Sequence, residues 1–589
     1  MKPSAIIPLF PLSLVVLWPL SNVTAQTSGG AGNLVERVRP GGMADQRRSP
    51  AAAEDSAALP NSAADAEEGD PKPLGVNLRA LQLVPKPAKA LPKDAHMVAV
   101  VDPALHLPER LADELRSEFL GQPVSMALLN RLVKKINKAY QATHFPLVDA
   151  YLPEQDITRG HVQIIIREAV LGEVRVEGAK HSSTDYMIRQ VRVPQGSRID
   201  TSVIGKDIRW LNENPIRNVK VVYERGKKEG TSDVILSTEE VKPFQAYVGY
   251  ANSGLVATGL NEVSGGFNWY QVLGTEQSLA YQFSGNQELD ALKAHALVWG
   301  VPFPWRHRLQ VIGVTAENSV QSVQTGGTLG VNGVSRQLTG AYSIPLGSAW
   351  SRVRHKLTVA ADYKSTSSDI LFGGQALAGN SAEVMQFRLG YELFVTDKLG
   401  YTRLSASGVY SPGNLLRRNT YEAFDQLRAR SQADYWYALA ELDRLLRLPR
   451  DCSIMLHLSG QYAGDRLLPT EQVLAGGYRS VRGYNESSAR GDSGIKASLE
   501  FNLPPFHFAK WAGGQDTLNC FAFYDMAYLT SIGDFASEPD QELHSAGLGL
   551  RYNVGDSVDL RLAYGWPLRS SGITDVPRGR LHFGMNVRY

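Results

Sequence analysis

The residues with the clearest chemical potential lie in a glycine-rich segment in the last quarter of the chain. Residues 474–484 read Leu-Ala-Gly-Gly-Tyr-Arg-Ser-Val-Arg-Gly-Tyr, and residues 491–494 read Gly-Asp-Ser-Gly. A guanidinium packed away from water is costly unless a carboxylate meets it, and a bidentate pair satisfies it best. Packed inside a protein, Arg482 would therefore need an acidic partner.

Asp525 is the candidate partner. It lies in the alternating run Phe521–Ala527, where a period of two places its side chain on the face opposite Tyr524 and Met526. If these two aromatic and apolar groups face outward, Asp525 faces inward. The simpler interpretation is a solvated surface arginine and an unrelated strand aspartate.

The Gly-Asp-Ser-Gly tetrapeptide also resembles the nucleophile loop of chymotrypsin-like proteases, in which an activated serine needs a histidine base. The match is weak, because Ile495 and Lys496 follow where that family continues with Gly-Pro, and His295 is a poor match to its histidine motif. A secreted serine protease is therefore only a weak alternative, and we predict that the chain is not an enzyme. Residues 490–492 spell the cell-adhesion tripeptide Arg-Gly-Asp, but three residues recur by chance, so no adhesion function is predicted from them.

Composition excludes several classes of protein. The 589 residues include 61 basic and 59 acidic side chains, which gives no polyanion-binding signal, so no nucleic-acid partner is expected. Cys452 and Cys520 are too few for a disulfide scaffold, and the sequence leaves open whether they pair. No His–Cys cluster has metal-site spacing and no glycine-rich phosphate loop is evident, so no cofactor is predicted.

The first 75 residues indicate export followed by a linker. A basic start, an apolar run over residues 5–20 and a small-residue end at Ala25 predict a signal peptide over residues 1–25. Residues 26–75 are rich in Ala, Gly, Ser, Pro and acidic groups, so they cannot bury a core, although residues 33–39 could form a short helix.

Residues 76–243 predict two small α+β domains. The first, 76–168, has helical patterns over residues 108–119, with Leu111, Leu115 and Phe119 on one face, and over 128–140, then strands over 147–152 and 161–167. The second, 169–243, has a strand at 172–177, helices at 184–191 and 203–211, and strands at 219–224 and 233–237.

Residues 244–589 change to a period of two, in segments of roughly ten residues, as in a transmembrane β-barrel. In residues 581–589, Leu, Phe, Met, Val and Tyr share one face, while His, Gly, Asn and Arg share the other. We count about sixteen such segments, an even number typical of bacterial barrels. The longest links, expected at the cell surface, fall near residues 321–331, 365–381, 411–432 and 464–493.

Several motifs together are similar to those of two-partner secretion transporters, the filamentous-hemagglutinin and hemolysin secretion and activation family. The two small domains resemble polypeptide-transport-associated (POTRA) domains. In the second one, Trp210, Asn214 and Pro215 resemble a segment of that family and are tentative substrate-binding residues. The alternative for this segment is a helix end that Pro215 stops, with Trp210 in a small core.

The glycine-rich segment resembles the family's sixth surface loop, which folds back into the barrel. The matching loop positions are Gly476, Gly477, Val481, Arg482, Gly483, Tyr484, Gly491 and Asp492. The family's Phe-x-Asp-x-Gly wall motif maps onto Phe523 and Asp525, with Ala527 in place of the usual glycine. The resemblance implies that Arg482 meets Asp525 on the inner wall, and the alanine leaves the packing of the loop at this point open.

The resemblance implies an outer-membrane translocator: a 16-stranded barrel with two periplasmic POTRA domains. It would capture a large unfolded exoprotein and export it, and the helix near residues 34–38 would plug the resting pore. The runner-up is a barrel-assembly factor of the same superfamily. Such factors usually carry more than two periplasmic domains.

Overall fold

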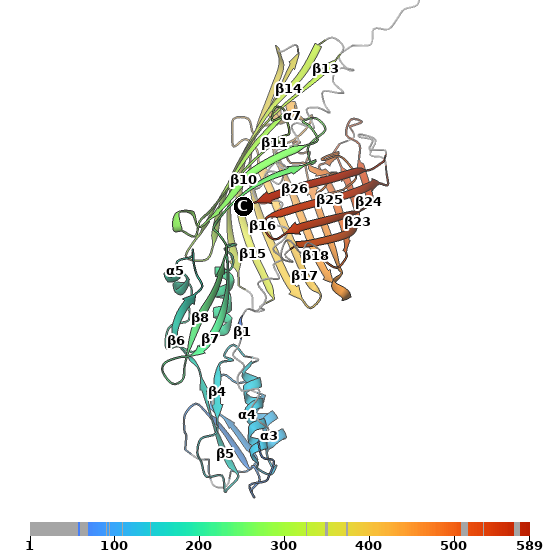
Figure 1. Cartoon of the computed structure of the whole chain (residues 1–589). Helices are drawn as coiled ribbons and strands as arrows, with labels where there is room; N and C mark the ends of the chain where they lie inside the picture. The colour runs from blue at the N-terminus through green and yellow to red at the C-terminus, as the bar shows by residue number, and fades with distance from the viewer. Residues whose placement is uncertain are drawn as a thin grey trace, which may run out of the picture. The chain divides into compact units, whose positions relative to one another are not determined.

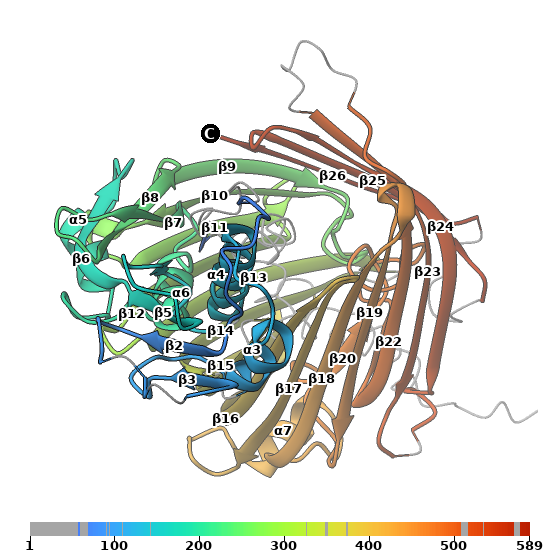
Figure 2. The ribbon, with the colours of Figure 1, turned by 90° about the horizontal axis from the view of Figure 1, so that it is seen from below.

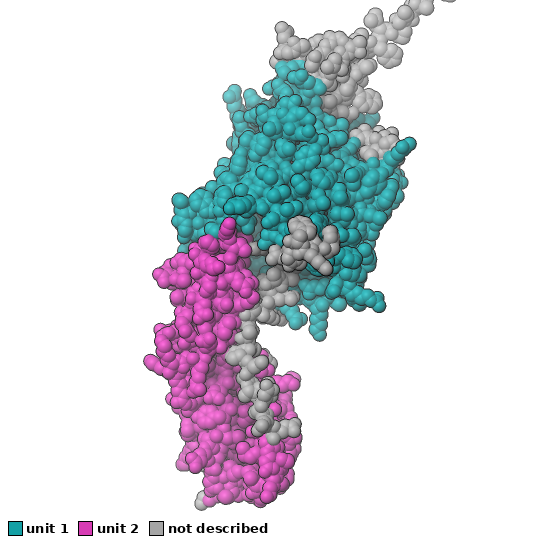
Figure 3. Space-filling view, viewed as in Figure 1, with its two compact units in different colours: residues 1–51, 243–589 teal, residues 52–242 magenta. Residues whose placement is uncertain are grey.

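The computed structural model divides the chain into two compact units, residues 52–242 and residues 1–51 with 243–589 (Figure 3). It describes residues 57–58, 69–89, 91–92, 95–108, 110–141, 143–324, 327–347, 352–372, 375–507, 516–533, 535–569 and 578–589. The predicted signal peptide and the predicted helix at residues 33–39 lie outside the described residues.

The first α+β domain is a four-stranded sheet with two helices. The strand order is β3-β2-β5-β4. In chain order its elements are β2 (Ala80–Val84), β3 (Val98–Val101), α3 (Leu111–Phe119), α4 (Met126–Gln141), β4 (Val148–Tyr151) and β5 (His161–Glu168). Leu111, Leu115 and Phe119 are buried together in its core, as their spacing predicted. The sequence analysis did not predict β2 or β3. β2 is a short apolar run that lacks the alternation of a half-exposed strand.

The second domain repeats this theme in the order strand, two helices, two strands. Its elements are β6 (Val170–Glu177), α5 (Thr184–Arg189), α6 (Thr201–Leu211), β7 (Arg217–Arg225) and β8 (Thr231–Glu240), with β1 (Ala57–Ala58) added at the edge in the order β1-β7-β8-β6. Asp200 caps α6, because its carboxylate accepts hydrogen bonds from the backbone of Ser202 and Val203. Among the described residues of both units, no helix is long and apolar enough to cross a membrane.

The larger unit contains a closed antiparallel barrel whose last strand pairs with its first (Figures 1 and 2). Within the described residues it has sixteen strands, which confirms the predicted number. They are β9 (Phe244–Ala251), β10 (Glu262–Tyr270), β11 (Ser278–Asn286), β12 (Leu292–Pro302), β13 (Arg308–Gln324), β14 (Gly327–Leu346), β15 (Val353–Phe372), β16 (Gln375–Asp397), β17 (Gly400–Pro412), β18 (Asp434–Arg447), β19 (Ser453–Ala463), β22 (Ser493–Asn502), β23 (Asp516–Thr530), β24 (Gln541–Val554), β25 (Val558–Pro567) and β26 (Arg580–Arg588).

The predicted alternation separates a lipid-facing surface from a polar interior. On β26, Leu581, Met585 and Val587 are exposed on the outside, whereas His582 and Asn586 are buried on the other face. Apolar groups on the outside and polar groups on the inside are what a bilayer and a watery lumen require.

Two of the predicted surface loops are instead extended hairpins. β13 pairs with β14 as far as Gln324 and Gly327, and β15 pairs with β16 as far as Phe372 and Gln375. These strands have 17 to 23 residues. About 9 to 11 residues suffice to cross a bilayer, so the prediction of roughly ten residues for every strand was wrong here. Ladder hydrogen bonds satisfy the backbone of a hairpin beyond the membrane as well as within it.

The two cysteines are free. Cys452 precedes Ser453, which pairs with Asn502, and the backbone amide of Leu503 donates to the carbonyl oxygen of Cys520. A strand therefore lies between the two cysteines. Two strand spacings are about 9.5 Å, which exceeds the Cα separation that a disulfide spans.

Candidate functional site: an ion-paired loop inside the barrel

The glycine-rich segment belongs to the link between β19 and β22, residues 464–492, which we call loop 6. It is the sixth link at the barrel end opposite the start of β9. Its two sides pair as β20 (Val473–Ala475) and β21 (Ala489–Gly491), which brings residues 476–488 together as a compact tip. The tip is largely buried, as the exposure of Val481, Arg482 and Tyr484 shows: each is at most 3% exposed.

The structure brings together the two residues that the sequence singled out. The Nε of Arg482 donates to Oδ2 of Asp525 at 2.7 Å, and its Nη2 donates to Oδ1 at 2.7 Å. The backbone amide of Arg482 donates to the same Oδ2 at 3.0 Å. Asp525, on β23, is fully buried, so this is a bidentate ion pair inside the barrel rather than a surface contact.

Residues that the sequence did not single out complete the ion pair. Ser498 lies between the partners: its hydroxyl donates to Oδ1 of Asp525 at 2.7 Å and accepts from Nη2 of Arg482 at 3.0 Å. Glu500 accepts from Arg482 and also from Nη2 of Arg551 at 2.8 Å. Both residues lie on the inward face of β22, so the alternation of residues 493–502 could have identified them.

The predicted wall residue Phe523 stacks against the guanidinium of Arg482. The Arg482 guanidinium carbon lies 3.6 Å from the centre of the Phe523 ring, a distance typical of a cation–π contact. Phe523 is 5% exposed and packs against Phe521 and Ala563. The ring therefore fixes the plane in which the guanidinium can meet Asp525.

Gly483 fits against the wall because it has no side chain. Its φ is +92°, and a Cβ there would lie 2.9 Å from the carbonyl carbon and oxygen of Gly565 on β25. Its backbone amide donates to Nε2 of His582 on β26 at 2.9 Å. The tip is thus held on several strands of the wall at once.

The other loop positions shape the tip. Gly476 and Gly477 have φ values of +102° and +96°, and a Cβ on either would collide with a neighbouring residue of the tip. The hydroxyl oxygen of Tyr484 lies 2.9 Å and 2.5 Å from the backbone oxygens of His544 and Arg569, and its single hydrogen donates to one of them. Gly491 passes so close to β23 that a Cβ would lie 2.7 Å from the oxygen of Thr530.

Ala527 packs where the resembling family has glycine. It is fully buried in one apolar cluster with Val481, Tyr484, Leu529 and Leu543. The alanine methyl group therefore fills space beneath the tip without preventing the Arg482–Asp525 contact.

Asp492 does not lie with the tip. It is fully buried at the base of loop 6, where its partner is Arg428 of the preceding surface loop. The sequence offered no sign of Arg428, because no pattern of spacing connects the two loops.

The tentative substrate-binding residues lie in the second α+β domain. Trp210 and Asn214 are buried, at 7% and 9% exposure, and Pro215 is half-buried just before β7. Burial favours the alternative in which this segment ends α6 and positions β7, so direct contact with a substrate stays a prediction.

The protease alternative gains no support. The hydroxyl of Ser493 accepts from the backbone amide of Ala463, and the ring of His295 contacts Tyr281 and Phe283 on the barrel wall. Within the described part of the chain, no three His, Cys, Asp or Glu side chains gather as a metal ion would need.

The sequence matches a family model described as haemolysin secretion/activation protein ShlB/FhaC/HecB over residues 230–552, more than half of the chain. The chain belongs to this family. A second model, the ShlB-type POTRA domain, matches residues 99–169. The α+β domain that spans most of these residues is therefore a POTRA domain.

Individual transporter proteins are also similar to this chain. The heme/hemopexin transporter protein HuxB of Haemophilus influenzae (strain 86-028NP) is 24% identical over 78% of this chain and 81% of its own length. The outer membrane transporter CdiB of Dickeya dadantii (strain 3937) is 22% identical over 67% of this chain and 70% of its own length. The solved structure of CdiB from Escherichia coli shares the fold, with a TM-score of 0.69 and 18% identity over 97% of this chain and 99% of that one.

The chain is an outer-membrane transporter of the two-partner secretion kind. The members of its family are transporters rather than enzymes. The POTRA domains are periplasmic in these systems, so the links after odd-numbered barrel strands, loop 6 included, start from the cell surface.

Proposed function

We propose that this transporter captures one unfolded partner exoprotein in the periplasm and exports it through its barrel, and that the Arg482–Asp525 ion pair holds loop 6 in the resting position. The observation that carries the proposal is the buried, bidentate ion pair between a surface loop and the inner wall of a closed barrel. A loop folded into the lumen occupies space that an exported chain needs. Loop 6 therefore has to shift when the exoprotein passes.

Capture takes place at the sheet edge of the second POTRA-like domain. The short strand β1 pairs in parallel with β7, through Ala57 opposite Val221 and Ala58 opposite Val222. This pairing supports an edge that accepts extended chain, because the open side of β7 offers backbone hydrogen bonds to any added strand. An unfolded exoprotein has the same backbone groups.

Trp210, Asn214 and Pro215 act on capture by positioning β7. Burial of Trp210 and Asn214 supports this indirect role over direct contact. Next to them, the Asn212 side chain donates to the oxygen of Val219 at 3.0 Å and accepts from its amide at 2.7 Å. The end of α6 is thereby fastened to the start of β7.

The inner wall suits the passage of a chain of varied sequence. Charges of both signs pair along neighbouring strands: Arg403 with Asp443 at 3.3 Å, and Lys356 with Glu392 at 3.3 Å. A wall with balanced charge neither holds an acidic or basic segment strongly nor offers an apolar surface to which an unfolded chain would adhere. The chain itself hydrolyses nothing, and folding of the exoprotein outside the cell prevents its return.

The runner-up, a barrel-assembly factor, is less well supported. The match to a secretion family over more than half of the chain favours export.

Export is tested directly by producing the transporter in a Gram-negative host together with the product of the neighbouring reading frame, which we expect to be a large secreted protein. We expect the exoprotein in the medium only when the transporter is present. Periplasmic retention of that exoprotein despite a folded transporter, or loss of other barrels from the membrane when the transporter is depleted in its own host, would contradict the proposal.

A further inference from the structure

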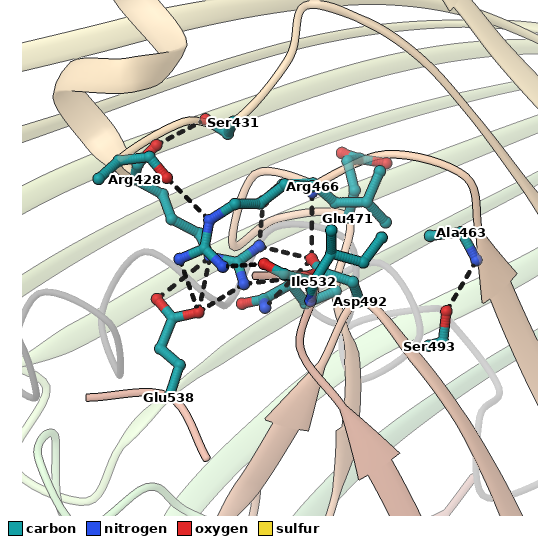
Figure 4. Close-up of polar contacts among 12 residues, drawn as sticks. Arg428, Ser431, Ala463, Arg466, Glu471, Asp492, Ser493, Ile532 and Glu538 are labelled. Atoms are coloured by element: carbon teal, nitrogen blue, oxygen red, sulfur yellow. Dashed lines mark hydrogen bonds and ion pairs between the residues drawn. The ribbon is translucent and has the colours of Figure 1, made fainter. Parts of the chain in front are cut away.

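Asp492 is a fully buried carboxylate with a saturated set of donors (Figure 4). Nη2 of Arg428 donates to its Oδ2 at 3.0 Å, and Nη1 of Arg428 donates to its Oδ1. The backbone amides of Leu467 and Ile532 donate to the two oxygens at 3.1 Å and 2.8 Å. These donors come from three different surface loops.

The three loops are consecutive. Arg428 follows α7 (Tyr421–Leu427) in loop 5, residues 413–433 between β17 and β18. Asp492 and Leu467 belong to loop 6. Ile532 belongs to loop 7, residues 531–540 between β23 and β24, of which 534 is not described. One carboxylate thus joins loops 5, 6 and 7.

A second carboxylate, Glu538 of loop 7, closes the network. It accepts from Nε of Arg428 at 3.1 Å and from Nη2 of Arg466, at the start of loop 6, at 2.9 Å. The Nε of Arg466 donates to the backbone oxygen of Ala429 in loop 5 at 2.8 Å. Two guanidinium groups and two carboxylates therefore meet in this network, and Figure 4 shows all four side chains converging.

The surroundings make this network sensitive to the loss of a member. Phe424, Leu467 and Leu468 are fully buried beside it, and the Arg466 guanidinium carbon lies 4.0 Å from the centre of the Phe535 ring. Although burial opposes ionisation, the hydrogen bonds and charges of Arg428 and Arg466 hold the pKa of Glu538 below its usual value. Removing one partner of a buried pair leaves an uncompensated charge, which is strongly destabilising.

We propose that Arg428 is the positioning residue of a second lock, which fastens the base of loop 6 through Asp492 and joins loops 5, 6 and 7 into one cover at the outer end of the barrel. The inference deepens the proposed function, since it rests on loop 6 having to shift during export. The first lock, Arg482 with Asp525, holds the tip of loop 6 on the wall. Release of loop 6 for an exported chain requires that the cover shifts as a unit or that both locks open.

The test uses Leu468, which is fully buried beneath the network. Leu468→Cys is introduced into the full chain carrying Cys452→Ser and Cys520→Ser, and a membrane-impermeant maleimide is added to intact cells. With Arg428 present the thiol should react slowly. In Arg428→Ala the labelling rate should rise about tenfold or more, because the buried carboxylate of Asp492 keeps its two amide donors but loses the cation that neutralises it.

Two controls separate a lock from general stabilisation. Arg444→Ala removes a more exposed ion pair, with Asp397 at 2.6 Å, at the other end of the barrel, and should leave labelling unchanged. A second probe, Ala296→Cys, lies 1% exposed on β12 in a cluster formed only by β12 and β13, and should not respond to Arg428→Ala. An equal rise at both probes, or no rise at Leu468→Cys, would overturn the second lock.

Folding and function are kept apart in the same experiment. Heat-modifiable migration reports whether each barrel has folded. If Arg428→Ala does not fold, Glu538→Gln takes its place, with an expected rise of about threefold because its side chain is 27% exposed.

The labelling experiment contains no exoprotein, and export by Arg482→Ala is measured separately. Unchanged labelling in Arg428→Ala together with an export defect in Arg482→Ala therefore contradicts the second lock alone. Faster labelling alongside normal export by Arg482→Ala contradicts the proposed function and removes the export role of the lock.

Discussion

Arg482 and Asp525 lie 43 positions apart in the chain, and their side chains form two parallel hydrogen bonds of 2.7 Å inside the barrel. A bidentate pair fixes orientation as well as distance, which a lysine at position 482 could not reproduce. The ion pair therefore determines where the tip of loop 6 rests on the wall.

Gly483→Ala should displace this tip. The substitution places a Cβ 2.9 Å from the backbone of Gly565 at a φ of +92°, so strain and collision act together. We expect export to fall by about tenfold or more and loop 6 to become open to added protease. Gly408→Ala is the matched control, since a Cβ there has open space and export should be unchanged. Equal export by both variants would contradict the close packing of the tip.

The β7 edge should contact the exoprotein during export. In a chain with Cys452→Ser and Cys520→Ser, a photoreactive maleimide on Val222→Cys, which lies on β7 and is 39% exposed, should cross-link to a stalled exoprotein. Arg175→Cys on β6, at the opposite edge of the same sheet, is the control and should give little product. Preferential cross-linking from Arg175→Cys would assign capture to the other edge.

Glu240 should stabilise the second POTRA-like domain in a pH-dependent way. It accepts from the backbone amides of Lys180 and His181 at 2.6 Å, and from Ser182, just before α5. Although burial opposes ionisation, these hydrogen bonds lower the pKa of Glu240 below its ordinary value of 4.5. A lowered pKa contributes stability that is fully present above the ordinary value and is lost as the pH falls through the lowered one.

Glu240→Gln should therefore reduce the protection of residues 180–190 from hydrogen exchange at pH 7 by about 1 to 2 kcal/mol. The difference from the unmodified chain should stay constant down to about pH 5 and shrink below pH 4.5. Glu177→Gln, at an exposed position on β6, is the control. A difference between Glu240→Gln and the unmodified chain that grows on acidification would contradict the assigned role of the carboxylate.

The segment before residue 45 should close the resting pore. A barrel of sixteen strands is wide enough for an aqueous channel. A helix near residues 34–38 on a long linker could enter and withdraw at modest entropic cost. Deleting residues 26–45 should increase the open time of single channels in planar bilayers. Unchanged conductance and open time would reject the plug.

Much of the fold could be predicted from the sequence because most elements obey a period. Leu111, Leu115 and Phe119 follow a helical spacing, and residues 581–589 alternate, so the sequence alone indicates which side chains share a face. β2 could not be predicted because it is buried on both faces and does not alternate. The length of the hairpins β13–β14 and β15–β16 could not be predicted because a strand pattern does not reveal where the membrane ends.

The tip ion pair could be predicted because a motif and a strand period converged on Arg482 and Asp525. The alternation of residues 493–502 could also have placed Ser498 and Glu500 on the inward face, but neither residue belongs to a motif. The partnership of Arg428 with Asp492 depends on how three irregular loops pack, and no local rule connects residues from different loops. Such tertiary contacts become visible only in three dimensions.

The central claim is tested most directly by measuring secreted exoprotein from Arg482→Ala and Asp525→Ala transporters. The control is Arg444→Ala, which removes a more exposed ion pair, and heat-modifiable migration shows that each barrel has folded. Both lock variants should insert normally and export at least about tenfold less exoprotein than the unmodified chain, because each leaves a buried charge without its main partner. The control, whose ion pair with Asp397 lies at the periplasmic turn, should export normally. Unimpaired export by both lock variants would contradict the account.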